Sequence, residues 1–170
     1  MAHYYKGKYR VESARLAGWD YRTPAWYFVT FCTRDHQCWL ANIIDGESYV
    51  SPRGLIVAEE WLRTPYVRPN VQLDAWCIMP NHVHGILGIT GGPEDPATPQ
   101  GQAGTLGTII GQIKSTCTKR IRDFGHADFG WQARFYDRVI RDEAELTRIQ
   151  QYIVKNPGKW FEDRYYRPAP

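Results

Sequence analysis

The segment 71–89 reads VQLDAWCIMPNHVHGILGI. It consists of two runs rich in apolar and β-branched residues, separated by Pro80-Asn81. Two such runs with turn residues between them are typical of neighbouring antiparallel strands. Alternate residues of a strand point to the same face of a sheet, about 6–7 Å apart. His82 and His84 are therefore expected side by side on one face, with Val83 directed to the other.

The rest of the chain alternates between the two periodicities of regular secondary structure. Strands are predicted where aromatic and β-branched residues cluster, and helices where apolar residues recur at helical spacing behind a capping residue. The predicted elements, in chain order, are a strand at Ala25–Thr33, an edge strand or hairpin at Gln37–Ile44, a helix from Ser51-Pro52 to Thr64-Pro65, strands at Val71–Met79 and His82–Ile89, a helix at Thr105–Asp123, a strand at Gln132–Ile140 and a helix from Asp142 to Asn156.

This order contains the β-α-β-β-α-β pattern of a ferredoxin-like α+β fold. Such a fold has an antiparallel sheet with its helices on one face, which leaves the other face free for a site or a partner. The additional C-terminal helix is the natural candidate to approach that free face.

Composition predicts one ordered domain. A length of 170 residues with seven Trp and eleven Tyr is enough for a proper core and argues against disorder. We expect a single domain at 1–170, flexible tails at 1–10 and 162–170, and a mobile Gly- and Pro-rich loop at 91–104. The start of the chain is polar and no apolar run approaches the roughly 20 residues of a membrane span. The four cysteines show no CxxC spacing, so reduced thiols and a cytoplasmic location are expected.

Charge is unevenly distributed around a net value of +3. Residues 105–141 contain seven Lys or Arg against three Asp, which makes this part of the chain basic. Such a block is either an ordinary solvated face or a surface that binds phosphate. The sequence leaves both readings open.

A tyrosine and an asparagine in the last predicted helix have a spacing that suits metal chemistry. Tyr152 and Asn156 are four residues apart and therefore share one helix face. Imidazole and amide oxygen, with positions left for water or phosphate, suit Mg²⁺ or Mn²⁺ better than a closed zinc site. Taken alone, the same residues also fit a packed tyrosine, a helix C-cap and two ordinary surface histidines.

A tyrosine nucleophile has a clear chemical rationale. Cleavage of a phosphodiester through tyrosine leaves a phosphotyrosine, which conserves the energy of the broken bond for rejoining. A free phenol has a pKa of about 10, so it needs a base, a water relay or the positive field of a metal. Four acidic or amide residues are available as partners, but nothing in the sequence places them: Glu59, Glu60, Asp74 and Gln151.

Three stretches together resemble one protein family. Leu73–Leu87 resembles the PNHxH strand of the HUH single-tyrosine transposases, and Trp131–Asp142 resembles the segment that precedes their catalytic helix. Tyr152–Pro157 is similar to the signature of that helix. The three occur in the family's order and extend the resemblance over roughly residues 10–160. The REP-associated tyrosine transposases are the branch that the chain resembles in particular.

The resemblance implies a ferredoxin-like endonuclease that cuts and rejoins single-stranded DNA near hairpins, with Mg²⁺ or Mn²⁺ as cofactor. By position, Tyr152 is the nucleophile and His82, His84 and Asn156 are the metal ligands. Many insertion-sequence relatives carry Gln at the third-ligand position, and Asn156 matches the REP-associated branch. Four basic residues are expected to contact the DNA: Lys114, Lys119, Arg120 and Arg134. Trp131 and Tyr136 are expected either to stack on bases or to pack in the protein.

Three other functions compete with this one. A non-catalytic nucleic-acid-binding regulator would use the sheet without cleaving. A metal-dependent hydrolase would use an activated water in place of Tyr152. An inactive relative would keep only a regulatory role, although all the motif residues are present. The sequence does not decide between a monomer and a homodimer in which the tyrosine helix serves the partner's histidines, and it predicts no membrane partner.

Overall fold

The computed structural model describes residues 4–5, 9–10, 16–21, 23–91 and 105–168. Residues 92–104 of the loop predicted at 91–104 and most of the tail predicted at 1–10 lie outside this part, as do residues 169–170. The elements in chain order are β1 (Tyr4–Tyr5), β2 (Tyr9–Arg10), β3 (Ala25–Cys32), η1 (Arg34–His36), β4 (Ala41–Ile44), β5 (Glu47–Val50), α1 (Pro52–Val67), β6 (Val71–Ile78), β7 (His82–Ile89), α2 (Leu106–Asp123), β8 (Tyr136–Ile140), α3 (Glu143–Lys155) and η3 (Pro157–Glu162).

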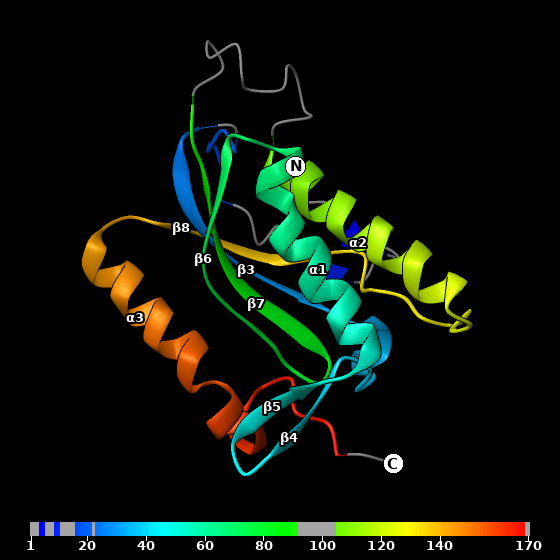
Figure 1. Cartoon of the computed structure of the whole chain (residues 1–170). Coiled ribbons are helices and arrows are strands. Elements are labelled where there is room, and N and C mark those ends of the chain that lie inside the picture. Colours follow the sequence, from blue (N-terminus) through cyan, green and yellow to red (C-terminus); the bar gives the residue numbers. More distant parts are fainter. Residues whose placement is uncertain (1–3, 6–8, 11–15, 22, 92–104, 169–170) are drawn as a thin grey trace.

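The main sheet has four strands in the order β6-β7-β3-β8, and each pairing is antiparallel. Helices α1 and α2 lie on one side of it and α3 lies on the other (Figure 1). The predicted α+β, ferredoxin-like fold with an additional C-terminal helix is therefore confirmed. Strands β4 and β5 form a separate hairpin, of which only the first strand was predicted.

Two apolar clusters hold the layers together. The larger lies between the sheet and the helices α1 and α2 and includes the fully buried Trp61, Val83 and Leu87. The smaller lies under α3, where Phe28 and Ile86 of the sheet contact Ile153. Strand β7 contributes to both clusters and is buried along its whole length. The C-terminal helix is thus packed on the face that the sequence left free.

Two predicted boundaries were wrong. Helix α1 was expected to end by Thr64-Pro65 but continues to Val67. Pro65 lacks an N–H to donate, yet the last turn still forms, because the Arg68 N–H donates to the carbonyl oxygen of Thr64 at 2.9 Å. Strand β8 begins at Tyr136, four residues later than predicted, because the residues before it pair with the sheet only at the isolated Thr33–Trp131 bridge.

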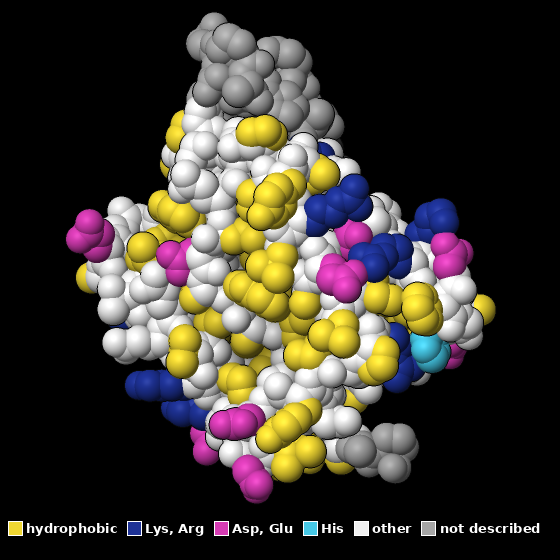
Figure 2. Space-filling model, in the orientation of Figure 1, with side chains coloured by type: hydrophobic (Ala, Val, Ile, Leu, Met, Phe, Trp, Pro, Cys, Tyr) yellow, Lys and Arg dark blue, Asp and Glu magenta, His cyan; other side chains and the backbone are white. Residues whose placement is uncertain are grey.

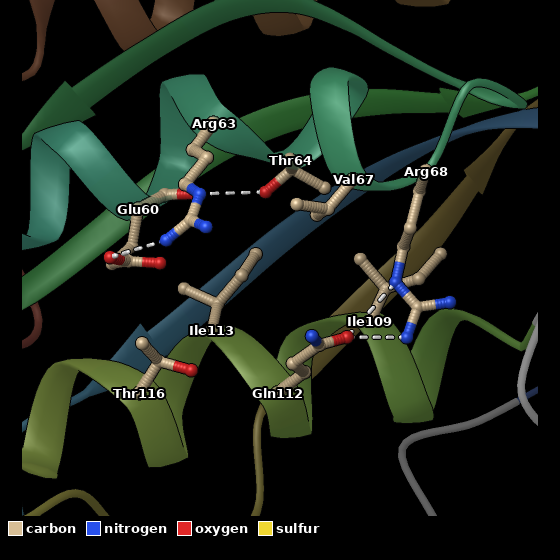
Figure 3. Close-up of a pocket in the computed structure, with 9 residues that line it drawn as sticks. All are labelled: Glu60, Arg63, Thr64, Val67, Arg68, Ile109, Gln112, Ile113 and Thr116. Atoms are coloured by element: carbon tan, nitrogen blue, oxygen red, sulfur yellow. Dashed lines mark hydrogen bonds and ion pairs between the residues drawn. The ribbon is translucent and has the colours of Figure 1, made fainter.

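Helices α1 and α2 are joined by polar contacts around a small cavity (Figure 3). Arg120 donates to Glu60 at 2.7 Å and to Glu59 at 2.6 Å, and Arg68 donates to the amide oxygen of Gln112. The cavity between these helices has a volume of about 90 Å³. This cavity lies on the opposite side of the sheet from the histidines of β7. We therefore interpret it as part of the contact between α1 and α2.

The face of the molecule that carries α1 does not present a basic surface. Figure 2 shows apolar side chains spread over this face, with Lys and Arg interspersed among Asp and Glu. Exposed apolar side chains of α1 include Leu55, Leu62 and Tyr66. No helix in the described ranges is long and apolar enough to cross a membrane.

Gly85 provides a test of the β7–α1 packing. A β-carbon at Gly85 would lie 2.4 Å from Cζ2 of Trp61, which is fully buried and cannot move aside. We expect Gly85→Ala to lower the free energy of unfolding by about 1–3 kcal/mol, the usual cost of overpacking a core. Urea denaturation measures this change.

Gly111→Ala is the matched control. Gly111 lies within α2, and a β-carbon there would meet nothing within 4 Å. The same substitution should stabilise the protein by up to about 1 kcal/mol, because alanine is the better helix former. Equal effects of the two substitutions would contradict the packing described for β7.

Candidate metal and nucleophile site

The site begins with the two histidines of β7. Strand alternation directs both His82 and His84 to the α3 side of the sheet, where neighbouring elements leave 0% and 1% of their surfaces exposed. Their Nε2 atoms are 3.1 Å apart. The pair that the sequence predicted is therefore brought together, with two ring nitrogens facing each other.

Hydrogen bonds at the opposite ring nitrogens fix the orientation of both histidines. Nδ1 of His82 lies 2.8 Å from the amide oxygen of Asn81, and Nδ1 of His84 lies 2.7 Å from the hydroxyl of Thr30. An amide oxygen only accepts, so His82 donates through Nδ1 and presents the lone pair of Nε2. Asn81 is itself held by two donated hydrogen bonds, to the carbonyl oxygens of His36 and Tyr165. Both rings thus have the orienting contacts typical of metal-binding histidines.

Burial keeps the two imidazoles in the form that binds metals. Burial, together with a smaller effect of the nearby His36, lowers the pKa of His82 to about 3. Burial and the adjacent His82 likewise lower the pKa of His84 well below its ordinary value. Both rings are therefore neutral near pH 7, which leaves nitrogen lone pairs free to ligate a cation.

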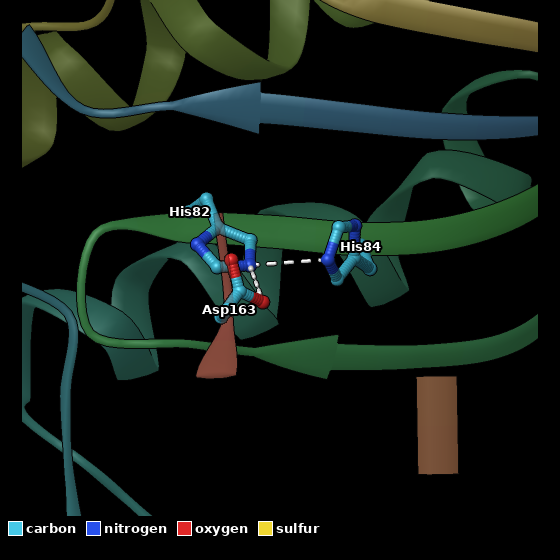
Figure 4. Close-up of side chains that lie close together, drawn as sticks. All are labelled: His82, His84 and Asp163. Carbon is cyan, nitrogen blue, oxygen red and sulfur yellow. Dashed lines mark hydrogen bonds and ion pairs between the residues drawn. The ribbon is translucent and has the colours of Figure 1, made fainter. Parts of the chain in front are cut away.

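A carboxylate from the C-terminal segment completes this group (Figure 4). Asp163 Oδ2 lies 3.8 Å from Nε2 of His82, and one atom each from Asp163, His82 and His84 lie within 4.8 Å of one another. The ring of Tyr165 covers the pair from the same segment, with its centroid 4.7 Å from that of His82. Residues 162–168, predicted as part of a tail, therefore form one wall of the site.

Helix α3 brings Tyr152 to the same place. Asp142 caps the helix by accepting the Glu145 N–H at 2.7 Å, and Ile153 anchors the apolar face of the helix on the sheet. The Tyr152 hydroxyl lies 3.4 Å from Nε2 of His84, while 45% of the residue stays exposed. Burial of the hydroxyl end raises the pKa of Tyr152, and the charge of Asp163 raises it further, so the phenol is protonated at neutral pH.

Asn156 lies at the end of α3 and is 3% exposed. Its Nδ2 donates to Asp163 Oδ2 at 3.1 Å. Its Oδ1 is buried and has no hydrogen-bond partner. An orphaned buried oxygen is costly, and a bound cation would satisfy it.

These donors fit a divalent cation. Two ligands in adjacent positions of an octahedral ion lie about 3 Å apart when each is about 2.1 Å from the metal, which matches the separation of the histidine Nε2 atoms. Imidazole nitrogens combined with amide and carboxylate oxygens suit Mg²⁺ or Mn²⁺. The residues that could hold the ion are His82, His84, Asn156 and Asp163.

A pocket of about 270 Å³ opens beside Tyr152. Its charged lining consists of three basic side chains, Lys155, Lys159 and Arg164, and two acidic ones, Glu162 and Asp163. The sequence did not single out the basic residues, because they are spread over a helix, a turn and the C-terminal segment and form no basic run. The pocket gives a phosphate a positively charged approach to the tyrosine hydroxyl.

The predicted DNA contacts on α2 lie away from this pocket, on the other side of the sheet. Lys114 donates to the carbonyl oxygen of Gln132, Lys119 pairs with Asp123, and Arg120 pairs with Glu59 and Glu60 as described above. Arg134 lies in the exposed segment before β8. The role of all four in DNA binding stays a prediction.

The two aromatic residues of the motif before α3 face opposite ways. Trp131 packs edge-on against Phe31 and donates to the carbonyl oxygen of Lys114, so it belongs to the core. Tyr136 is 37% exposed on the α3 side of the sheet, edge-on to Phe28. Phe28 in turn contacts Tyr152, so Tyr136 is the one available for stacking near the site.

Relatives of the chain place it in a family. A Haemophilus influenzae protein of uncharacterised function is 31% identical over 96% of this chain and 97% of its own length. The chain belongs to the same family as this protein. A second protein of that species, provisionally named a REP-associated tyrosine transposase, is 29% identical over 50% of this chain and 48% of its own length. No family model matches the chain.

The fold is shared with a solved transposase. The structure of a REP-associated tyrosine transposase bound to a REP hairpin superposes with a TM-score of 0.55 and 21% identity. The match covers 79% of this chain and 67% of that one. The shared fold and the partial match to the named relative agree with the resemblance to the REP-associated tyrosine transposases.

Thr30 provides a test of the histidine geometry. Thr30→Val replaces a buried hydroxyl by a methyl group of similar size and removes the partner of His84 Nδ1. We expect Mn²⁺ affinity to fall roughly 10–100-fold, as for other residues that orient metal ligands. Calorimetric titration measures the affinity. Thr64→Val is the control, since the Thr64 hydroxyl donates only within α1, and equal affinities for the two variants would contradict the orienting role.

Proposed function

We propose that the protein is a metal-dependent endonuclease and transposase that cleaves and rejoins single-stranded DNA near hairpins through a phosphotyrosine. The observation that carries this proposal is the position of Tyr152, whose hydroxyl lies 3.4 Å from Nε2 of His84 and whose side chain lines the basic pocket. A nucleophile, a set of metal ligands and an approach for phosphate thus occur together. The fold shared with a REP-associated tyrosine transposase and the partial match to a relative provisionally given that name support the same reading.

The histidines and the end of α3 would hold the cofactor. His82, His84 and Asn156 offer two imidazole nitrogens and one amide oxygen, as the resemblance implies. Mg²⁺ or Mn²⁺ bound there would polarise the scissile phosphate and offset negative charge on the phenol oxygen. The surrounding side chains exclude bulk water from the histidines, which strengthens electrostatic interactions in the site.

Tyr152 performs the bond exchange. Its oxygen attacks the phosphorus, a new bond to the tyrosine forms, and the bond to one deoxyribose oxygen breaks. The phenolic proton is lost to solvent or to a base, and the departing deoxyribose oxygen gains a proton to become a hydroxyl. The reverse reaction by a DNA hydroxyl rejoins the strand and frees the tyrosine.

Hairpin DNA is the partner that fits this account. The solved transposase of the same fold is described as bound to a REP hairpin, and a hairpin presents single-stranded flanks whose phosphates can enter the basic pocket. Tyr136 is placed to stack on a base beside the reacting phosphate. We propose a single domain that acts either alone or as a homodimer.

The first test concerns the nucleophile. Tyr152→Phe removes one oxygen and should leave binding of a pool of labelled single-stranded hairpins unchanged while abolishing their cleavage. Wild-type protein with Mn²⁺ should give a labelled adduct of protein size on a denaturing gel, and EDTA should prevent it. Tyr66→Phe is the control, because Tyr66 is 87% exposed on α1 across the sheet.

Each outcome of this test selects one function. An adduct that forms with wild type and Tyr66→Phe but not with Tyr152→Phe supports the tyrosine mechanism. Cleavage without an adduct in all three proteins would point to a hydrolase that activates water. Binding of hairpins without any cleavage would favour the regulator.

The second test concerns the metal. His84→Ala removes one ligand, and we expect Mn²⁺-stimulated cleavage to fall by at least about 100-fold. His126→Ala, in the turn after α2, is the control and should cleave as wild type does. Cleavage rates measured over a Mn²⁺ titration give the result. Undiminished stimulation of His84→Ala by Mn²⁺ would refute the assignment of this ligand.

A further inference from the structure

We propose that Asp163 is an anionic ligand of the metal site, supplied by the C-terminal segment to the two histidines of β7. This inference rests on the proposed function. It adds to the ligand set a residue that the resemblance does not imply, from a segment that the sequence predicted as a tail.

The first argument is the burial of the carboxylate. Only 2% of the Asp163 side chain is exposed. A buried carboxylate costs several kcal/mol unless a cation or hydrogen bonds compensate it. Its position against the histidine pair therefore needs a physical reason.

The second argument is the way the carboxylate is held. Oδ1 accepts the N–H of Tyr165 at 2.7 Å, and Oδ2 accepts Nδ2 of Asn156 at 3.1 Å. These two bonds fix the side chain with Oδ2 directed at the histidines, as Figure 4 shows. Each carboxylate oxygen accepts about two bonds, so Oδ2 keeps a lone pair for a further partner.

The third argument is the absence of a basic partner among the residues that the structure describes. The basic residue nearest in sequence, Arg164, instead places its guanidinium over the ring of Tyr165, 4.7 Å from the ring centroid. The carboxylate of Asp163 faces His82, with Oδ2 at 3.8 Å from Nε2 of that ring. His82 carries its proton on Nδ1, which donates to Asn81. Its Nε2 therefore presents a lone pair to the carboxylate oxygen of Asp163. Two acceptors that face each other repel, and a cation bound between them would turn this repulsion into attraction.

The separations agree with this arrangement. Two ligands of one ion lie between about 3 and 4.2 Å apart when each is about 2.1 Å from the metal. The distances of 3.1 Å between the histidines and 3.8 Å from His82 to Asp163 both fall in that range. Asn156 then has two roles, since it positions Asp163 through Nδ2 and offers a buried Oδ1 that has no hydrogen-bond partner.

Direct metal binding tests the proposal without relying on activity. Mn²⁺ is titrated into the full-length protein and the free ion is followed by electron paramagnetic resonance. Asp163→Asn keeps the side-chain shape and the acceptor for Tyr165 but loses the charge. We expect its Mn²⁺ affinity to fall at least about tenfold relative to wild type. Glu162→Gln removes the same charge from an exposed neighbour and should bind as wild type does.

His84→Ala separates this inference from the proposed function. If His84→Ala loses Mn²⁺ while Asp163→Asn binds as tightly as wild type, Asp163 is not a ligand and the metal-dependent function survives. If wild type itself binds no Mn²⁺, both the inference and the metal-dependent function are overturned. Loss of affinity in Asp163→Asn and His84→Ala, with retention in Glu162→Gln, supports both.

A ligand exchange covers the case in which Asp163→Asn does not fold. Asp163→Cys places a thiolate where the carboxylate was, and thiolates prefer soft ions such as Cd²⁺. This variant should give a stronger thiolate-to-Cd²⁺ absorption band than wild type and Glu162→Cys. Any band in those two proteins comes from native thiols such as Cys77, which pairs with His84 across β6 and β7. Identical spectra for all three proteins would overturn the proposal.

Discussion

The site depends on the double burial of strand β7. This strand pairs with β3 on one side and β6 on the other, and its two faces are covered by α1 with α2 and by α3. Alternation along such a strand leaves no freedom in where its side chains point. A shift of one residue would place Val83 among the polar groups and both histidines in the apolar core. The same packing that stabilises the sheet therefore fixes the spacing of the imidazoles.

Three parts of the chain then close around that strand. The sheet supplies the histidines and Thr30, α3 supplies Tyr152 and Asn156, and the segment after η3 supplies Asp163 and Tyr165. Closure removes water, which keeps the histidines neutral and the Tyr152 phenol protonated. The tyrosine is thus unreactive by itself, and its activation requires positive charge or a proton acceptor beside its oxygen.

Local periodicity explains which features could be predicted from the sequence. The spacing of two along a strand predicted the His82–His84 pair, and the spacing of four along a helix predicted that Tyr152 and Asn156 share a face. Asp163 carries no such signal, because it lies after a short irregular helix and reaches the histidines only through the folding of the C-terminal segment. For the same reason the basic pocket was missed, while the basic residues of α2 drew attention to the opposite side of the sheet.

The boundaries that were wrong have a related cause. Local rules treat Pro65 as a stop signal, but the further turn forms with the Arg68–Thr64 backbone hydrogen bond, and the Arg68 side chain at its end donates to Gln112 of α2. The central claim, that Tyr152 is the nucleophile, is tested most directly by mapping the tyrosine that becomes linked to DNA. Wild-type protein is reacted with hairpin DNA and Mn²⁺, digested with nuclease and trypsin, and analysed by mass spectrometry. The account predicts a nucleotide on the peptide Ile149–Lys155, which contains one tyrosine. A nucleotide on Tyr136 or Tyr165 instead would contradict it.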